Sequence, residues 1–90
     1  MVRLYIILVY DVSVERINKV RQFLKRYLNW VQNSAFEGEL KEGDIEKIKV
    51  ELKRIIDEKE DSIILYKTHN RKWVKKDVLG IEKSEVTTFI

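Results

Sequence analysis

Residues 2–10 read VRLYIILVY, a run in which β-branched, aliphatic and aromatic side chains fall on both alternating sets of positions. This composition favours a β-strand, and apolar residues on both faces indicate a central strand that is covered on at least one side. The run stops at Asp11, and Ser13 is a good N-cap because its hydroxyl can accept a bond from a free backbone N–H. Helical spacing then predicts one apolar helix face, which consists of Val14, Ile17, Val20, Leu24 and Leu28.

The middle of the chain supplies a second helix and further strands. Residues 30–40 favour β structure, either as one strand with a bend or bulge at Gly38 or as two short strands in a hairpin. Asp44 is expected to cap the second helix. Residues 62–67 predict a further buried strand. The apolar face of the second helix is expected to consist of Ile45, Ile48, Leu52, Ile55 and Ile56.

This order of elements is typical of a ferredoxin-like α+β domain, βαββαβ, in which an antiparallel sheet carries both helices on one face. We expect a single domain over residues 1–90. The second sheet face would be apolar, because residues 2–10 are apolar on both sides, and such a face is normally buried by a partner. A homodimer is the expected solution. Within residues 78–90, the short apolar run over 78–81 is expected to add an extra strand to the partner's sheet.

Composition excludes several classes of site. The chain has 90 residues, of which 44% are hydrophobic, and this suits one domain with a core of its own. It has no cysteine and one histidine, His69, which excludes disulfide scaffolds, thiolate zinc sites and histidine-rich metal centres. No apolar run approaches the roughly 20 residues of a membrane helix, so we expect a cytoplasmic protein with no membrane partner.

The net charge of +3 hides an uneven distribution of charged residues. Residues 14–30 contain five bases and one acid, and residues 67–76 contain five bases and no acid. Basic segments favour phosphates, because Lys and Arg displace condensed counterions from nucleic acids. The competing interpretation is that these lysines only keep a small protein soluble. For the first segment the two interpretations have equal weight. The second segment also contains His69 and Trp73, and this favours contact with a polyanion.

Few residues could perform chemistry. Asp11 follows an apolar strand and precedes a helix, and a turn or helix-entry cap is the simpler interpretation on position alone. The functional alternative is a carboxylate that holds a divalent cation, because Mg²⁺ keeps several waters and takes only one or two carboxylates. A dimer with Asp11 near its two-fold axis would supply two carboxylates. His69 is expected to be a solvent-exposed spectator, and the three scattered glycines build no phosphate-binding loop.

Three segments carry a family resemblance. Tyr10–Asp11 closes the first strand, residues 31–38 read VQNSAFEG, and residues 78–81 read VLGI. Together, in this order and in a chain of this size, they resemble the second of the CRISPR-associated proteins (Cas-two), the small dimeric partner of the CRISPR integrase. The resemblance extends over essentially the whole chain.

The resemblance implies a ferredoxin-like homodimer in which the Asp11 residues of the two subunits face each other and bind Mg²⁺. It implies metal-dependent endonuclease activity, on single-stranded RNA or on duplex DNA, and a role in CRISPR spacer acquisition. Tyr10, Ser34 and Phe36 match family positions around that site. The family also uses arginines in the first helix, and Arg16, Lys19 and Arg21 compete for that match; lysine is a point charge without the bidentate fork of arginine.

Two functions of different class therefore stay open. As an enzyme, the dimer would hydrolyse phosphodiesters with the help of Mg²⁺ at the paired Asp11 residues, with Tyr10, Ser34 and Phe36 as the other catalytic candidates. As an adaptor without catalysis, it would bridge the CRISPR integrase and hold spacer DNA by its backbone. A toxin-type messenger-RNA endonuclease of related fold is a third interpretation. The expected contacts to nucleic acid are Arg16, Lys19, Arg21, Lys72, Lys75 and Lys76.

Overall fold

The computed structural model describes residues 3–70, 72, 74, 75 and 77–80. The element order confirms the predicted βαββαβ pattern. The elements are β1 (Arg3–Asp11), α1 (Val14–Leu24), β2 (Asn29–Gln32), β3 (Ala35–Lys41), α2 (Glu42–Ile55) and β4 (Ser62–Thr68).

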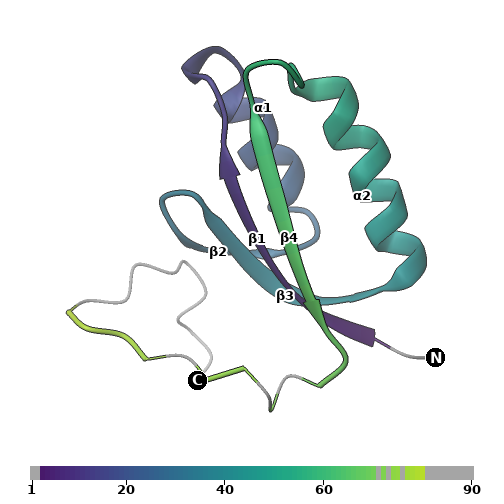
Figure 1. Cartoon of the computed structure of the whole chain (residues 1–90), viewed down its shortest axis with the longest axis vertical. Helices are drawn as coiled ribbons and strands as arrows, with labels where there is room; N and C mark the ends of the chain where they lie inside the picture. The colour runs from purple at the N-terminus through teal and green to yellow at the C-terminus, as the bar shows by residue number, and fades with distance from the viewer. Residues whose placement is uncertain (1–2, 71, 73, 76, 81–90) are drawn as a thin grey trace.

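The four strands form one antiparallel sheet in the order β2-β3-β1-β4 (Figure 1). Strand β1 is therefore central, as its apolar composition predicts. It pairs with β3 from Arg3 to Val9 and with β4 from Tyr5 to Asp11. Both helices cover the same face of this sheet, which is the ferredoxin-like arrangement.

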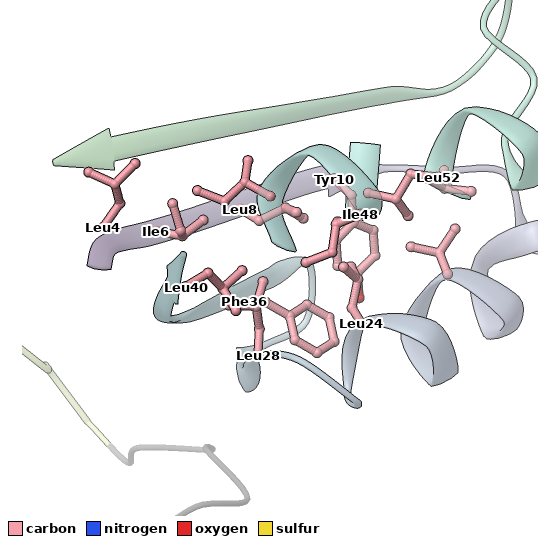
Figure 2. Packing of buried hydrophobic residues seen from close by; sticks show 13 residues of the cluster. Leu4, Ile6, Leu8, Tyr10, Leu24, Leu28, Phe36, Leu40, Ile48 and Leu52 are labelled. Carbon is pink, nitrogen blue, oxygen red and sulfur yellow. The ribbon is translucent and has the colours of Figure 1, made fainter. Parts of the chain in front are cut away.

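The core lies between the sheet and the two helices (Figure 2). Alternate residues of β1 point into it, and Ile6 and Leu8 are fully buried there. Phe36 of β3 and Val20 of α1 are also fully buried. The remaining members are Leu4, Tyr10, Val12, Leu24, Leu28, Leu40, Ile45, Ile48 and Leu52.

Helix α1 begins where the sequence predicts and ends earlier. The Ser13 hydroxyl accepts a hydrogen bond from the backbone N–H of Glu15 at 3.4 Å, so the predicted N-cap is confirmed. The helix ends at Leu24 and turns follow, and thus Leu28 lies outside it. Leu28 is still buried in the core, because the turns return its side chain to the sheet.

Helix α2 begins before the predicted cap. Lys41 occupies the N-cap position without a side-chain hydrogen bond, and the helix starts at Glu42. The prediction that Asp44 caps this helix is therefore wrong. Asp44 lies in the first turn, where a negative charge is favoured by the positive end of the helix dipole.

The segment after α1 forms two strands rather than one. Strands β2 and β3 are joined by a tight turn at Asn33 and Ser34, and Asn33 has a φ of +30°, a left-handed conformation that asparagine tolerates. The expected bulge at Gly38 is wrong, because Gly38 pairs regularly with Ile6, and the register shift lies between Trp30 and Gln32. Glycine serves a different purpose there: a Cβ at position 38 would lie 3.0 Å from Leu28 Cδ2.

The face of the sheet opposite the helices carries a row of apolar residues. Ile7 of β1 pairs with Tyr66 of β4, and Val9 pairs with Ile64. The exposed fractions are 37% for Val9, 48% for Ile64 and 58% for Tyr66. The strand predicted over residues 62–67 is thus confirmed, but its predicted burial is wrong, because Ile64 and Tyr66 are exposed. We call Ile7, Val9, Ile64 and Tyr66 the open-face patch.

The predicted strand over residues 78–81 is not tested. Residues 77–80 form no strand, and Val78 and Leu79 are exposed. Residue 81 and the terminal run over 86–90 lie outside the described residues, and the added strand stays a prediction.

Truncation of the central strand tests this account of the core. Leu8→Ala should lower the free energy of unfolding by about 2–5 kcal/mol, because it leaves a cavity at a fully buried site. Val50→Ala on the exposed face of α2 should change it by less than about 0.5 kcal/mol. Chemical denaturation followed by circular dichroism measures both, and equal losses would contradict the assignment of the core.

Candidate active site

Asp11 is the last residue of β1, and it is exposed. Its sheet partner is Ser62, the first residue of β4. Because side chains alternate along a strand, Asp11 lies on the same sheet face as Ile7 and Val9. The candidate metal ligand therefore borders the open-face patch.

The simpler interpretation of Asp11 was a turn residue or a helix-entry cap, and the structure tests the second of these. The cap of helix α1 is Ser13, two residues later, so Asp11 is not the helix-entry cap. Its carboxylate offers the hard oxygen donors that Mg²⁺ prefers. Within the described residues, no group of three or more histidine and acidic side chains could hold a metal ion.

Tyr10 points the opposite way, into the core, and is 2% exposed. Its phenol donates a hydrogen bond to the carbonyl oxygen of Asn33 at 2.8 Å and accepts one from Arg21 Nε at 2.9 Å. Its backbone N–H donates to the carbonyl of Ser34 at 3.0 Å. The Trp30 indole also donates to the Asn33 carbonyl, at 3.2 Å. These bonds fasten the β2–β3 turn to the end of β1.

The other two catalytic candidates lie around Tyr10. The Phe36 ring is fully buried, with its centroid 5.8 Å from that of Tyr10. Ser34 is half-buried in the β2–β3 turn. The structure thus brings Tyr10, Ser34 and Phe36 together as a support beneath the end of β1, with Asp11 on the other face. Their catalytic roles stay predictions.

Arg16 is already engaged by acids. Its Nε lies 2.7 Å from Asp61 Oδ2, and its Nη2 lies 3.0 Å from Glu60 Oε1. Glu15 is a third partner, with Oε1 3.4 Å from Nη1. These pairs raise the pKa of Arg16 above its already high ordinary value, mainly through the hydrogen bond to Asp61. The predicted contact of Arg16 with nucleic acid would have to compete with them.

Asp61 is a residue of this region that its sequence neighbourhood did not reveal. Its side chain is fully buried, and it accepts hydrogen bonds from Arg16 and from the backbone N–H groups of Ser13 and Asp57. The bond from Arg16 is the main reason that the pKa of Asp61 is held well below its ordinary value; burial opposes this shift, and the two backbone N–H groups reinforce it. The sequence contains one indication of this arrangement. A capping box has Glu or Gln at the third helical position, and this chain has Arg16 there, so the N–H of Ser13 needs another acceptor.

The remaining basic candidates are spread over two regions. Lys19 is exposed on α1, and Arg21 is half-buried beside Tyr10. Lys72 and Lys75 are exposed, and Lys76 lies outside the described residues. His69 follows β4 at the end that pairs with Tyr5, whereas Asp11 pairs with the opposite end. At about 3.3 Å per residue, His69 lies roughly 20 Å from Asp11 along the strand, too far for the two side chains to act together.

Comparison with known proteins places the chain in a family. Residues 4–76 match the family model described as "CRISPR associated protein Cas2". The chain belongs to the CRISPR-associated Cas2 family. Neither helix in the described ranges has the length and apolar character that a membrane span requires.

Two Cas2 relatives align over nearly their full length. One, "CRISPR-associated endoribonuclease Cas2" of Pyrococcus furiosus, is 53% identical over 87 residues, which are 97% of this chain and 100% of that protein. Another, "CRISPR-associated endoribonuclease Cas2 2" of Archaeoglobus fulgidus, is 53% identical over 79 residues, 88% of this chain and 86% of that protein.

Solved Cas2 structures have the same fold. A structure titled "Crystal structure of cas2" aligns with a TM-score of 0.84 at 43% identity and covers 98% of this chain and 99% of its own. Cas2 of Streptococcus pyogenes aligns with a TM-score of 0.74 at 34% identity, over 84% of this chain and 99% of its own. The ferredoxin-like fold and the family resemblance expected from sequence are both confirmed.

The lowered pKa of Asp61 predicts an acid-sensitive fold. A carboxylate whose pKa is lower in the folded than in the unfolded state stabilises the fold fully above the unfolded value, about 3.9, and loses that contribution as pH falls toward the folded value. The free energy of unfolding should therefore decrease steadily below about pH 4. Asp61→Asn should flatten this decrease, which urea denaturation at several pH values measures. Glu60→Gln, at an exposed partner of the same arginine, should retain most of it; an equally steep decrease in Asp61→Asn would contradict the prediction.

Proposed function

We propose that this Cas2 protein is a metal-dependent endoribonuclease that acts as a homodimer, with Asp11 of each protomer holding one shared Mg²⁺. The position of Asp11 carries the proposal, because an exposed carboxylate ends the central strand on the sheet face opposite the helices. The endoribonuclease names of relatives at about half identity support RNA as the substrate.

The open-face patch supports dimerisation through this sheet face. Val9, Ile64 and Tyr66 form an exposed apolar surface on neighbouring strands, and a surface of this kind is normally buried by a partner. In a two-fold dimer the same patch meets itself. Because Asp11 borders the patch, such a dimer would bring two Asp11 carboxylates to one interface.

Mg²⁺ suits the groups that this interface would offer. It is commonly bound by one or two carboxylates and keeps several waters, and each protomer offers one exposed Asp11. When bound, the ion would supply an activated water and neutralise charge that develops on a phosphodiester. Tyr10 and the β2–β3 turn would keep the end of β1 rigid beneath Asp11.

The exposed lysines would recruit the nucleic acid. Lys19, Lys72 and Lys75 are exposed and can contact phosphates without reading bases. Arg16 and Arg21 already have protein partners, at Asp61 and at Tyr10 respectively. Recruitment by lysine charge is screened by salt, so affinity should depend on ionic strength rather than on sequence.

A charge placed in the open-face patch tests the dimer. Ile64→Lys should shift the protein toward monomer by at least tenfold in dissociation constant, because the lysine would have to be buried at the interface. Val50→Lys adds the same charge at an exposed apolar residue of α2 and should leave the dimer intact. Sedimentation equilibrium at micromolar concentration measures both, and a monomeric wild-type protein would contradict the proposal.

Replacement of Asp11 separates catalysis from architecture. Asp11→Asn should reduce Mg²⁺-dependent RNA cleavage by orders of magnitude, since the charges that hold the ion are removed. Folding and dimerisation should survive, and the dimer should gain slightly without metal because two like charges no longer repel each other.

The matched control is Glu39→Gln, which removes a carboxylate from an exposed β3 position on the same sheet face and should leave cleavage unchanged. Unchanged cleavage in Asp11→Asn would contradict the enzymatic proposal and favour the adaptor function. Loss of folding would make Asp11 a structural turn residue.

A further inference from the structure

The carboxylate of Asp61 accepts four hydrogen bonds. Its Oδ1 accepts from the Ser13 backbone N–H at 3.0 Å and from Arg16 Nη2 at 3.1 Å. Its Oδ2 accepts from Arg16 Nε at 2.7 Å and from the Asp57 backbone N–H at 2.9 Å. The side chain has no exposed surface. Four donors to one buried carboxylate define its position closely.

These bonds join two connections that are far apart in the sequence. Ser13 and Arg16 lie where the chain leaves β1 and enters α1, and Asp57 lies in the connection from α2 to β4. In a capping box the N–H of the N-cap residue is satisfied by Glu or Gln at the third helical position. Here that position is Arg16, and Asp61 satisfies the Ser13 N–H instead.

Asp11 is held between the two ends of this link. Ser62 follows Asp61 directly and pairs with Asp11 across the sheet. Ser13, two residues after Asp11, is bonded to Asp61 itself. The backbone around Asp11 is therefore held at two places. Strand β4 holds it through the pairing of Asp11 with Ser62, and Asp61 holds it through the N–H of Ser13.

We propose that Asp61 is a positioning residue for the Asp11 carboxylate, with Arg16 holding the Asp61 side chain in place. This inference rests on the proposed function, in which Asp11 binds Mg²⁺. An ion shared by two protomers depends on the placement of both carboxylates, and Mg²⁺ accepts little deviation from octahedral geometry. Groups that orient a metal ligand commonly affect affinity tenfold to a hundredfold.

Asp61→Asn is the informative change. Asparagine keeps the size of the side chain, but one of its two polar ends becomes an NH₂ donor. Each of the four groups bonded to the Asp61 carboxylate is a donor. The NH₂ end of the asparagine would therefore face two donors without a bond, either Arg16 Nε and the Asp57 N–H or the Ser13 N–H and Arg16 Nη2. The turn that follows Asp11 should loosen while the core on the far side of the sheet stays packed.

The experiment has two readouts on the 90-residue chain. Titration calorimetry with Mg²⁺ and with Mn²⁺ measures metal affinity, and amide hydrogen exchange measures the protection of residues 11–15. Asp61→Asn should weaken metal binding by about tenfold to a hundredfold and speed exchange at Ser13. Glu60→Gln alters only an exposed partner of Arg16 and should resemble wild type in both.

Ile45→Val controls for stability, because it loosens the buried core under the opposite end of α2. It should lower the melting temperature without changing metal affinity or the protection of residues 11–15. If Asp61→Asn left both readouts unchanged, or if Ile45→Val reproduced its effects at equal loss of melting temperature, the inference would be overturned.

Failure of the proposed function would look different. Wild-type protein that binds neither ion, or Asp11→Asn that binds both as wild type does, would contradict the metal site at Asp11. Hydrogen exchange would then decide the inference alone: faster exchange at Ser13 in Asp61→Asn would uphold the positioning of this turn, and unchanged exchange would overturn it.

Discussion

A central strand that is apolar on both faces needs a cover on each of them, and α1 and α2, the helices of the described residues, both cover the same face of β1. Ile6 and Leu8 are fully buried beneath α1 and α2, and they anchor a core built from β1, β3 and the two helices, with Val12 and Leu28 from the turns beside α1 (Figure 2). Val9 and its neighbour Ile64 remain exposed on the other face. The architecture of one protomer follows from the first set of contacts, and our proposed dimer follows from the second.

Side chains also alternate between the two sheet faces at the end of β1, so the supporting residue and the proposed metal ligand lie on opposite faces. Tyr10 points inward and fastens the β2–β3 turn through the Asn33 carbonyl, while Asp11 stands on the open face. The Arg16–Asp61 ion pair stabilises the chain just after Asp11. It also engages the guanidinium of Arg16, which the sequence had indicated as a contact to nucleic acid. In our account, the buried side of the site is structural and the exposed side binds the ion.

Local signals in the sequence predicted most of the fold. The apolar run of β1 and the Ser13 cap depend on neighbours in the chain, and both predictions are confirmed. Asp44 was misassigned because an acid in the first turn of a helix has the same pattern as a cap. Gly38 was misjudged because its role depends on Leu28, ten residues away. Asp61 was missed because its partner Arg16 lies 45 residues away, and no periodic pattern reveals such a pair.

The central claim is that dimerisation through the open face of the sheet joins two Asp11 carboxylates into one metal site. A crystal structure of the protein grown with Mn²⁺ tests it most directly, because anomalous scattering locates the ion independently of the chain. The account predicts one Mn²⁺ on the dimer axis, within about 2.0–2.3 Å of an Asp11 oxygen from each protomer. A dimer formed through another surface, or Mn²⁺ bound only at other residues, would contradict it.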